Sequence, residues 1–206
     1  MPTHLLDRRS HPPRQHVALR DGVTLDRARA HEACGPARRT FALWLAAACE
    51  GPVMWISPAW GAAGLNPDGM MDFCDPARFL FVCAPRNDDI LWCMEEALRS
   101  GAVPLVVADL PGPPAMTPVR RLHLAAENGG AAAGLAPLGL LLTLDGGGAP
   151  GIESRWHLAP AHAGKQRIWQ LERRRARTLP PKGWRLTQRA PRAALEERGA
   201  AQAAAG

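Results

Sequence analysis

The segment from Gly35 to Thr40 has the residue types of a phosphate-binding loop. A glycine turn follows a segment of strand character, residues 28–34, and an apolar helix begins just after Arg39 and Thr40. In a P-loop, backbone amides cradle a phosphate, a lysine neutralises its charge, and a serine or threonine binds the metal. The sequence therefore indicates a candidate nucleotide site made by Gly35, Arg39 and Thr40.

This loop departs from the P-loop pattern at several positions. The pattern G-x-x-x-x-G-K-[ST] needs eight positions, whereas Gly35 to Thr40 supplies six, lacks the second glycine and has Arg39 in place of lysine. Pro36 removes one amide donor, and a planar guanidinium fits a tight cradle less well than an ammonium. The site is therefore degenerate. The alternative is that Arg38 and Arg39 are only the exposed start of a helix.

A metal-binding carboxylate is a second candidate. The apolar segment 103–108 ends at Asp109, which is the shape of a Walker B strand whose aspartate holds Mg²⁺. An ATPase also needs an acid that activates water, but the four residues after the strand at 53–56 contain none. We therefore expect no hydrolysis, no catalytic residue and no cofactor. ATP with Mg²⁺ at Asp109 and the degenerate loop is the alternative.

Other side chains with catalytic or metal-binding chemistry form no recognisable arrangement. The seven histidines are scattered along the chain without sensibly spaced partners. The five cysteines lie in or beside apolar segments, with an odd count and no C-x-x-C spacing. This pattern indicates reduced, mostly buried thiols rather than disulfides or a zinc site. We therefore expect no metal centre.

Positive charge is concentrated in the C-terminal quarter. From Lys165 onward there are eleven Lys or Arg against three Glu, whereas the rest of the chain has fourteen basic and sixteen acidic residues. Such an asymmetry favours an acidic partner such as nucleic acid, and a solubilising tail is the alternative. The candidate partner-binding or DNA-binding residues are Arg173, Arg174, Arg175, Arg177, Lys182 and Arg185.

The elements that must position these side chains are clearest between residues 79 and 110. Residues 79–83 are a continuous apolar run, typical of a strand buried on both faces. Asn87 is expected to cap a helix with apolar residues at helical spacing, and Gly101 to end it. A second apolar strand then leads to Asp109. This order predicts a right-handed βαβ unit.

The remaining pattern predicts one α/β domain with a mostly parallel central sheet and a C-terminal antiparallel section. A helix is expected from Thr117, its cap, to Gly129, where it stops. Residues 1–22 are expected to be a flexible basic leader, 23–188 the domain, and 189–206 an Ala-rich tail, loosely helical or disordered. No run approaches the ~18 apolar residues of a membrane span, and the start lacks a signal-peptide core. We therefore expect a cytoplasmic protein without membrane contact.

The order of these parts resembles the RecA fold, with its phosphate loop, Walker B strand and C-terminal antiparallel strands. Several segments are also similar to the ImuA family, RecA-like accessory proteins of SOS-induced mutagenesis. Residues 91–100 (LWCMEEALRS) and 120–127 (RRLHLAAE) carry the most specific similarity, and the resemblance spans roughly residues 28–187. Within the first segment, Glu95 and Glu96 are expected to be exposed and available to a partner.

The resemblance implies a three-layer RecA-like fold and a role in the bacterial SOS DNA-damage response. ImuA proteins act in translesion synthesis with ImuB, a Y-family polymerase homologue, and an error-prone replicative-type polymerase. The implied partners are thus an ImuB-type protein and a RecA-type recombinase. The links after Asp109 and after Leu144, where RecA carries its DNA-binding loops, are short, so autonomous filament formation on DNA is not expected.

The function expected from these observations is that of a non-catalytic RecA-like adaptor. Two alternatives remain open at the level of the sequence. The first is a DNA-dependent ATPase of the RecA superfamily with an atypical phosphate loop. The second is a cell-division inhibitor similar to SulA, which is also a RecA-fold relative without nucleotide chemistry.

Overall fold

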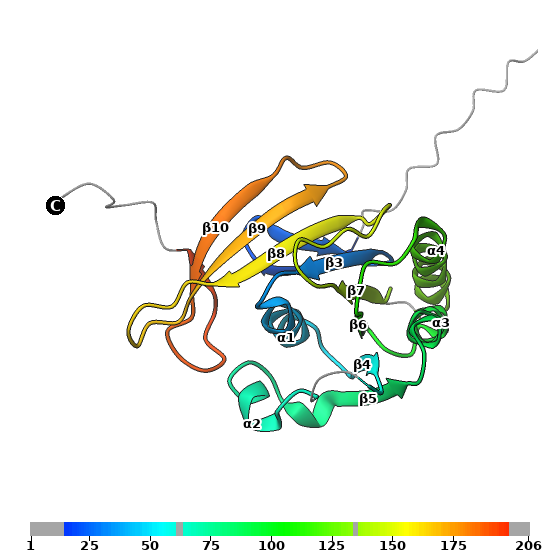
Figure 1. Cartoon of the computed structure of the whole chain (residues 1–206), viewed down its shortest axis with the longest axis horizontal. Coiled ribbons are helices and arrows are strands. Elements are labelled where there is room, and N and C mark those ends of the chain that lie inside the picture. Colours follow the sequence, from blue (N-terminus) through cyan, green and yellow to red (C-terminus); the bar gives the residue numbers. More distant parts are fainter. Residues whose placement is uncertain (1–14, 61–63, 134–135, 198–206) are drawn as a thin grey trace, which may run out of the picture.

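The computed structural model describes residues 15–60, 64–133 and 136–197. A nine-stranded mixed sheet is the centre of the fold (Figure 1). Its strands are β3 (Ala30–Cys34), β4 (Val53–Pro58), β5 (Phe79–Ala84), β6 (Leu105–Asp109), β7 (Leu138–Leu142), β8 (Ser154–Pro160), β9 (Ile168–Ala176), β10 (Lys182–Thr187) and β11 (Glu196–Glu197). Their order across the sheet is β11-β10-β9-β8-β3-β7-β6-β4-β5.

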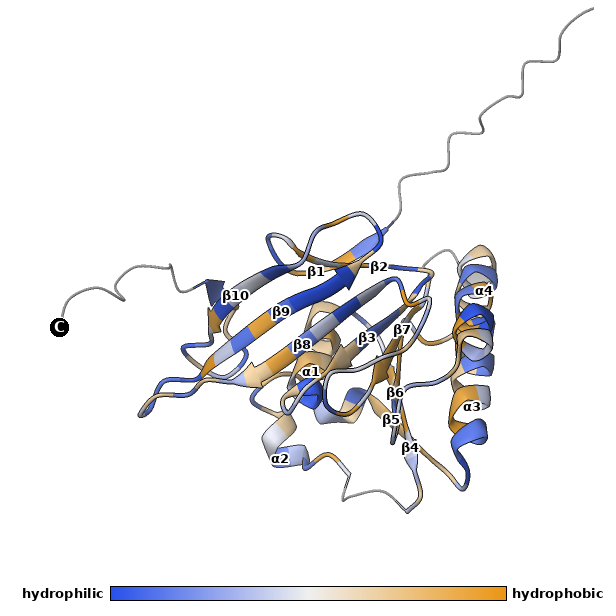
Figure 2. Cartoon of the chain, turned by 45° about the horizontal axis from the view of Figure 1, so that its top comes forward, coloured by the Kyte–Doolittle hydropathy of each residue, from blue (hydrophilic) through white to orange (hydrophobic). Residues whose placement is uncertain are grey.

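The sheet has a parallel part and an antiparallel part. The neighbours from β5 through β4, β6, β7 and β3 to β8 are all parallel, whereas β8 to β11 pair antiparallel. The predicted α/β class with a mostly parallel sheet and an antiparallel C-terminal section is therefore confirmed. β6 and β7 are buried throughout, as is typical of parallel strands covered on both faces. β8, β9 and β10 instead contain many polar and charged residues (Figure 2).

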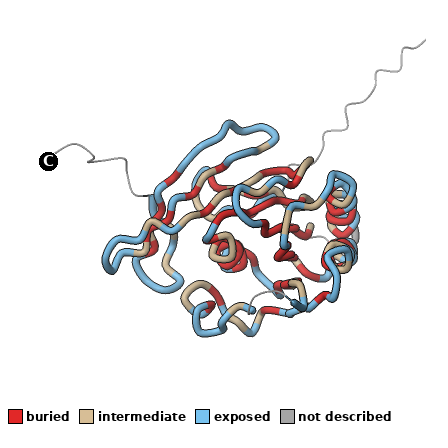
Figure 3. Tube along the Cα trace, viewed as in Figure 1, coloured by how far each residue is buried: buried red, intermediate tan, exposed pale blue. Residues whose placement is uncertain are grey.

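Helices cover the two faces of the sheet. On one face lie α1 (Arg38–Ala48) and the hairpin of β1 (His16–Arg20) and β2 (Val23–Asp26), with the short α2 (Pro67–Met70) beside them. On the other face lie α3 (Asn87–Ser100) and α4 (Met116–Ala133). A 3-10 turn, η1 (Pro76–Arg78), precedes β5. Each face has its own apolar cluster, and the buried residues follow the sheet and the inner sides of the helices (Figure 3).

The unit between residues 79 and 110 differs in detail from its prediction. β5, α3 and β6 follow one another, but β4 lies between the two strands and β5 forms the sheet edge. The expectation that this strand is buried on both faces is wrong, because Leu80 and Phe81 are half exposed. Helix α3 begins at Asn87, so its cap residue is Arg86, which makes no side-chain capping bond. Gly101 ends the helix with a φ of 66°, as predicted.

Helix α4 is longer than its sequence signals indicate. Thr117 is already inside the helix, which begins at Met116, and Gly129 does not stop it, because the helix continues to Ala133. The reason lies in packing: a Cβ at position 129 would collide with the carbonyl oxygen of Leu98 at the end of α3. The glycine allows the two helices to approach closely, and the intact helical hydrogen bonds outweigh the propensity penalty of about 1 kcal/mol.

Part of each expected terminal segment belongs to the fold. β1 lies inside the range 1–22 that was expected as a leader, and its Val17 is buried against the apolar cluster of α1. Residues 1–14 and 198–206 lie outside the described residues. In the C-terminal segment, Arg192 donates its backbone N–H to Asp72 at 2.7 Å, and β11 pairs with β10. Within the described ranges, no helix has the length and apolarity needed to cross a membrane.

Candidate nucleotide site and basic face

The structure brings Arg39 and Asp109 into direct contact. β3 leads into the loop at Gly35, and β6 ends at Asp109. Both strands run parallel to β7, which lies between them, so their carboxyl ends lie at the same end of the sheet. Arg39 Nε donates to Asp109 Oδ2 at 2.8 Å, and Arg39 Nη2 lies 2.7 Å from the same oxygen. Arg38 Nε lies 3.7 Å from the other carboxylate oxygen. The buried Asp109 is thus neutralised by the chain itself.

The backbone of the loop is also engaged within the chain. Gly35 has a φ of 89°, and a Cβ there would collide with the ring of His157 and the carbonyl of Leu158, which requires glycine whether or not a phosphate is bound. The N–H of Ala37 donates to the Leu158 carbonyl at 3.0 Å, and that of Arg38 to the Gly35 carbonyl at 3.2 Å. At least these two amides are therefore directed at protein acceptors.

Thr40 and Gly35 lie at the same end of the sheet as Asp109. Thr40 is in the first turn of α1 and is partly exposed. The four residues predicted for the nucleotide site are therefore brought together as a group. What the sequence pattern could not show is that the arginine at the lysine position would bind the aspartate directly.

A buried carboxylate beside this site was not singled out from the sequence. Glu32, in the middle of β3, is fully buried, and its Oε1 accepts bonds from Thr143 Oγ1 at 2.7 Å, Gly148 N at 2.8 Å and Ala149 N at 3.2 Å. Its Oε2 binds the guanidinium of Arg155. The available signal was an acid in the middle of segment 28–34, which has strand character. Because it is fully satisfied, Glu32 anchors the segment after β7 rather than acting as a general base.

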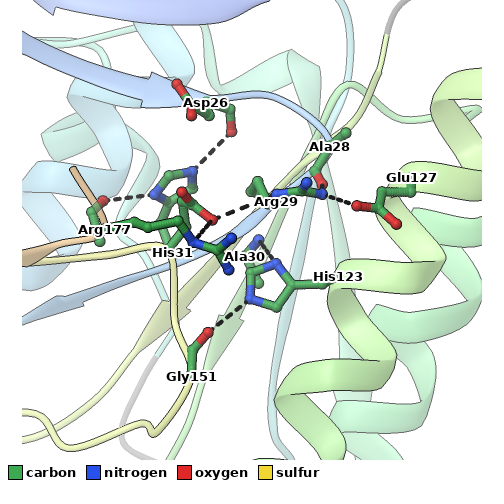
Figure 4. A network of polar contacts seen from close by, with 11 residues as sticks. Asp26, Ala28, Arg29, Ala30, His31, His123, Glu127, Gly151 and Arg177 are labelled. Atoms are coloured by element: carbon green, nitrogen blue, oxygen red, sulfur yellow. Dashed lines mark hydrogen bonds and ion pairs between the residues drawn. The ribbon is translucent and has the colours of Figure 1, made fainter. Parts of the chain in front are cut away.

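Two histidines form a polar network at the opposite end of β3 (Figure 4). His31 Nε2 lies 2.8 Å from the carbonyl oxygen of Asp26, and His31 Nδ1 lies 2.7 Å from Ser154 Oγ. Since a carbonyl only accepts, Nε2 carries the hydrogen and Nδ1 accepts from the hydroxyl. Ser154 Oγ in turn accepts from the Trp156 indole at 2.8 Å. Burial lowers the pKa of His31 to about 4, so the ring is neutral and structural.

His123 ties α4 to the sheet in the same network (Figure 4). Its Nδ1 accepts from the N–H of Ala30 at 3.2 Å, and its Nε2 donates to the carbonyl of Gly151 at 3.1 Å. Burial also lowers the pKa of His123. Both ring nitrogens of this histidine therefore have backbone partners that suit the neutral form.

Arg173 is not available on the surface, in contrast to its place among the expected binding residues. Its side chain is buried, with the guanidinium carbon 5.7 Å from the ring centroid of Trp156 and 5.3 Å from that of Trp184. It donates to the carbonyl of Pro180 at 3.1 and 3.0 Å and to that of Gly22 at 3.3 Å. Desolvation lowers its pKa. Arg173 therefore clamps the β1–β2 turn to the β9–β10 loop.

The other five candidate basic residues are exposed, and together they are called the basic face: Arg174, Arg175, Arg177, Lys182 and Arg185. Some have acidic neighbours, since Arg174 Nε lies 3.0 Å from Glu172 and Arg177 Nε 3.6 Å from Glu153. β8 is parallel to β3, and β9 is antiparallel to β8, so the β9–β10 loop lies at the end of the sheet opposite Asp109. The part of the basic face at this loop is thus separate from the candidate nucleotide site, whereas Arg174 comes close to Gly146 in the loop that follows β7, on the side of Asp109.

Glu95 is not exposed as expected. Its side chain is 8% exposed, and its carboxylate binds Arg99 on the same helix and Arg121 on α4, the latter at 2.7 Å. The carboxylate therefore links α3 to α4, while Glu96 remains exposed.

Comparison with known proteins gives no relative from which the chemistry of this site can be transferred. No known protein family matches the chain, and no curated protein matches it significantly. Within the described part of the chain, no group of three or more His, Cys, Asp or Glu is arranged to hold a metal ion. What the site can do is therefore argued from its own residues: Arg39 and Asp109 form a closed, charge-neutral pair.

Proposed function

We propose that this chain is a non-catalytic adaptor with a RecA-like architecture, acting in the cytoplasm in the bacterial SOS DNA-damage response. In this role it supports error-prone translesion synthesis, together with an ImuB-type Y-family polymerase homologue and an error-prone replicative-type polymerase. The observation that carries the non-catalytic part of the proposal is the direct contact between Arg39 and Asp109.

That contact opposes nucleotide chemistry for an electrostatic reason. In an ATPase of this kind, the basic residue of the loop must face the phosphates and the Walker B aspartate must face Mg²⁺. Here the Arg39 guanidinium and the Asp109 carboxylate bind each other, and at least two loop amides donate to protein carbonyls. Binding Mg-ATP would require the Arg39–Asp109 pair to open and the Asp109 carboxylate to be re-paired with the metal.

The order of elements supports the RecA-like part of the proposal. From β3 onward the chain runs through α1, β4, β5, α3, β6, α4 and β7 to the antiparallel strands β8 to β10, which is the order implied by the resemblance. The two segments with the most specific ImuA similarity are α3 and the middle of α4, and these helices pack against each other. The partners proposed on this basis are an ImuB-type protein and a RecA-type recombinase.

Affinity capture tests the adaptor role. The tagged full-length chain, isolated from cells treated with a DNA-damaging agent, is expected to retain an ImuB-type and a RecA-type protein. The same capture from undamaged cells and capture with the bare tag serve as controls. Recovery of neither protein after damage, when both are shown to be present in the lysate, would contradict the adaptor role.

Weak nucleic-acid binding is proposed for the basic face. Replacing Arg174, Arg175, Arg177 and Lys182 by alanine should remove most binding to single-stranded DNA, and the parent affinity should fall steeply with salt because counterions are released. Arg173 stays unchanged because it is buried. The matched control removes the same number of positive charges elsewhere, by replacing the exposed Arg86, Arg120, Lys165 and Arg189. Equal losses in the two variants would show that overall charge, and not this face, binds DNA.

A DNA-dependent ATPase is the second candidate, and one observation favours it. Arg39 and Asp109 do meet at the carboxyl ends of parallel strands, where ligands bind in open α/β folds, and Thr40 lies in the adjoining first turn of α1. Asp109→Ala and Arg39→Ala separate the two functions: each should abolish turnover in an ATPase, whereas neither should affect partner capture by an adaptor if the fold is retained.

A further inference from the structure

β5 is an open apolar edge of the large sheet (Figure 1). Among the described residues no strand pairs with its outer side. Leu80 is 50% exposed and Phe81 51%, and Cys83 is exposed as well. The strand, FLFVCA, contains no charge and no proline. Such an edge is a template for pairing with another strand.

The opposite edge of the sheet is protected and provides a contrast. Its last strand, β11, has only two residues, both glutamates, and it covers only Leu186 and Thr187 of β10. β10 also carries the exposed Lys182 and Arg185. Short edge strands and charged side chains are devices that prevent edge-to-edge pairing. β5 has neither, so the two edges of one sheet differ in what they permit.

The hydrogen-bonding direction of β5 follows from its contact with β4. The carbonyl of Ala84 accepts from the N–H of Ala59, which extends β4, at 2.9 Å. The ladder to β4 is regular from Phe79 to Ala84. Because the polar groups of successive residues in a strand point to opposite sides, those of Phe81 and Cys83 point to the open edge. The edge therefore offers two donors and two acceptors in register.

We infer that β5 pairs antiparallel with β5 of a second copy of this chain, joining two sheets across a twofold axis. The side chains are complementary to themselves. If the axis passes through Phe81, the two Phe81 rings become neighbours and Leu80 lies opposite Val82. If it passes through Val82, Phe81 lies opposite Cys83. In either register each half-exposed side chain meets an apolar one, and cross-strand aromatic pairs add stability.

Charge distinguishes between the possible registers of the two copies. In a parallel pair, Arg78 and Arg86 would each lie beside the same residue of the second copy. In the antiparallel register through Val82, Arg78 would lie directly opposite Arg86 of the second copy. The register through Phe81 offsets these two arginines by two residues, so repulsion favours that register. A single six-residue strand pair is a small interface compared with the roughly 1,200–2,000 Å² of stable complexes, so the dimer should be weak and concentration-dependent.

Hydrogen exchange and sedimentation of the full chain, in reducing buffer, test this inference. The amides of Phe81 and Cys83 should exchange rapidly in dilute protein and slowly in concentrated protein, in step with a shift from monomer to dimer. The amides of Val82 and Ala84 face β4 and should be protected at both concentrations. A chain that remains monomeric at high concentration, with rapid exchange at Phe81 and Cys83, would overturn the inference.

Phe81→Lys supplies the matching variant. A charge from each copy at the edge should raise the dissociation constant about 100-fold, which corresponds to roughly 2.7 kcal/mol. Leu124→Lys is the control, because Leu124 is 59% exposed, slightly more than Phe81, but lies on α4. Dimerisation that survives Phe81→Lys, or that is lost equally in the control, would show that β5 is not the interface. Circular dichroism of both variants confirms that the fold is retained.

Discussion

At the scale of single residues, Asp109 and the basic residue of the loop compensate each other. An aspartate that is only 5% exposed needs a positive charge close by, which a metal supplies in an ATPase. Here Arg39 supplies it with two contacts to one oxygen. A planar guanidinium is a poor fit for a tight phosphate cradle, but it matches the geometry of a carboxylate well. The arginine at the lysine position therefore explains the closed pair, and it is one of the departures of this loop from the P-loop pattern.

A double-mutant cycle on this pair measures its strength. Arg39→Leu and Asp109→Asn should each lower the free energy of unfolding by about 1–3 kcal/mol, because each leaves one group without its partner. The double variant should lose less than both single losses together, with a coupling of about 1 kcal/mol or more. Arg86 and Asp89, an exposed pair on the surface of α3, form the control with a much weaker coupling. Additive losses at Arg39 and Asp109 would contradict the closed pair.

The neutral His31 predicts a pH dependence of stability. Its pKa is about 4 in the folded chain and 6.5 ordinarily, so between these values the unfolded chain binds more protons. The free energy of unfolding should therefore be independent of His31 titration above pH 6.5, and it should fall by about 3 kcal/mol as the pH falls from 6.5 towards 4. His31→Gln should flatten this part of the curve, although His123 keeps some slope. Chemical denaturation of both proteins at several pH values provides the comparison, and identical slopes would refute this role.

At the scale of elements, the sequence predicted which segments form strands and helices better than it predicted their neighbours. Apolar runs and helical spacing located β5, α3 and β6, because these patterns depend on local geometry. The edge position of β5 depends on sheet order, which no local pattern contains. The burial of Arg173 between two tryptophans likewise requires strands that are far apart in sequence. For the site, residue types indicated the group, but not the direct pairing inside it.

Gly129 provides the test at this scale. Gly129→Ala should raise helix propensity by about 1 kcal/mol, yet it should lower the free energy of unfolding by more than that, because the new Cβ collides with the backbone of Leu98. Gly69→Ala in α2, where the Cβ meets open space, should be neutral or slightly stabilising. Thermal and denaturant unfolding distinguish the two. A stabilised Gly129→Ala variant would show that the α3–α4 approach is not as tight as described.

At the scale of the whole molecule, three regions with different chemistry are centred on different parts of the sheet. The Arg39–Asp109 pair lies at the carboxyl ends of the parallel strands, and the β9–β10 loop, with Arg177 and Lys182, lies at the opposite end of the sheet. The apolar β5 is the open edge of the sheet. An adaptor needs separate surfaces for separate partners, and it needs no open cradle at the sheet edge. This separation is compatible with the proposed function and is independent of whether β5 forms a dimer.

Titration of the purified chain with Mg-ATP, by calorimetry and by a hydrolysis assay with single-stranded DNA present, tests the central claim most directly. The closed Arg39–Asp109 pair predicts no saturable binding and no turnover above that of the Asp109→Ala variant. Saturable binding together with hydrolysis that Asp109→Ala abolishes would contradict the adaptor account and establish an ATPase.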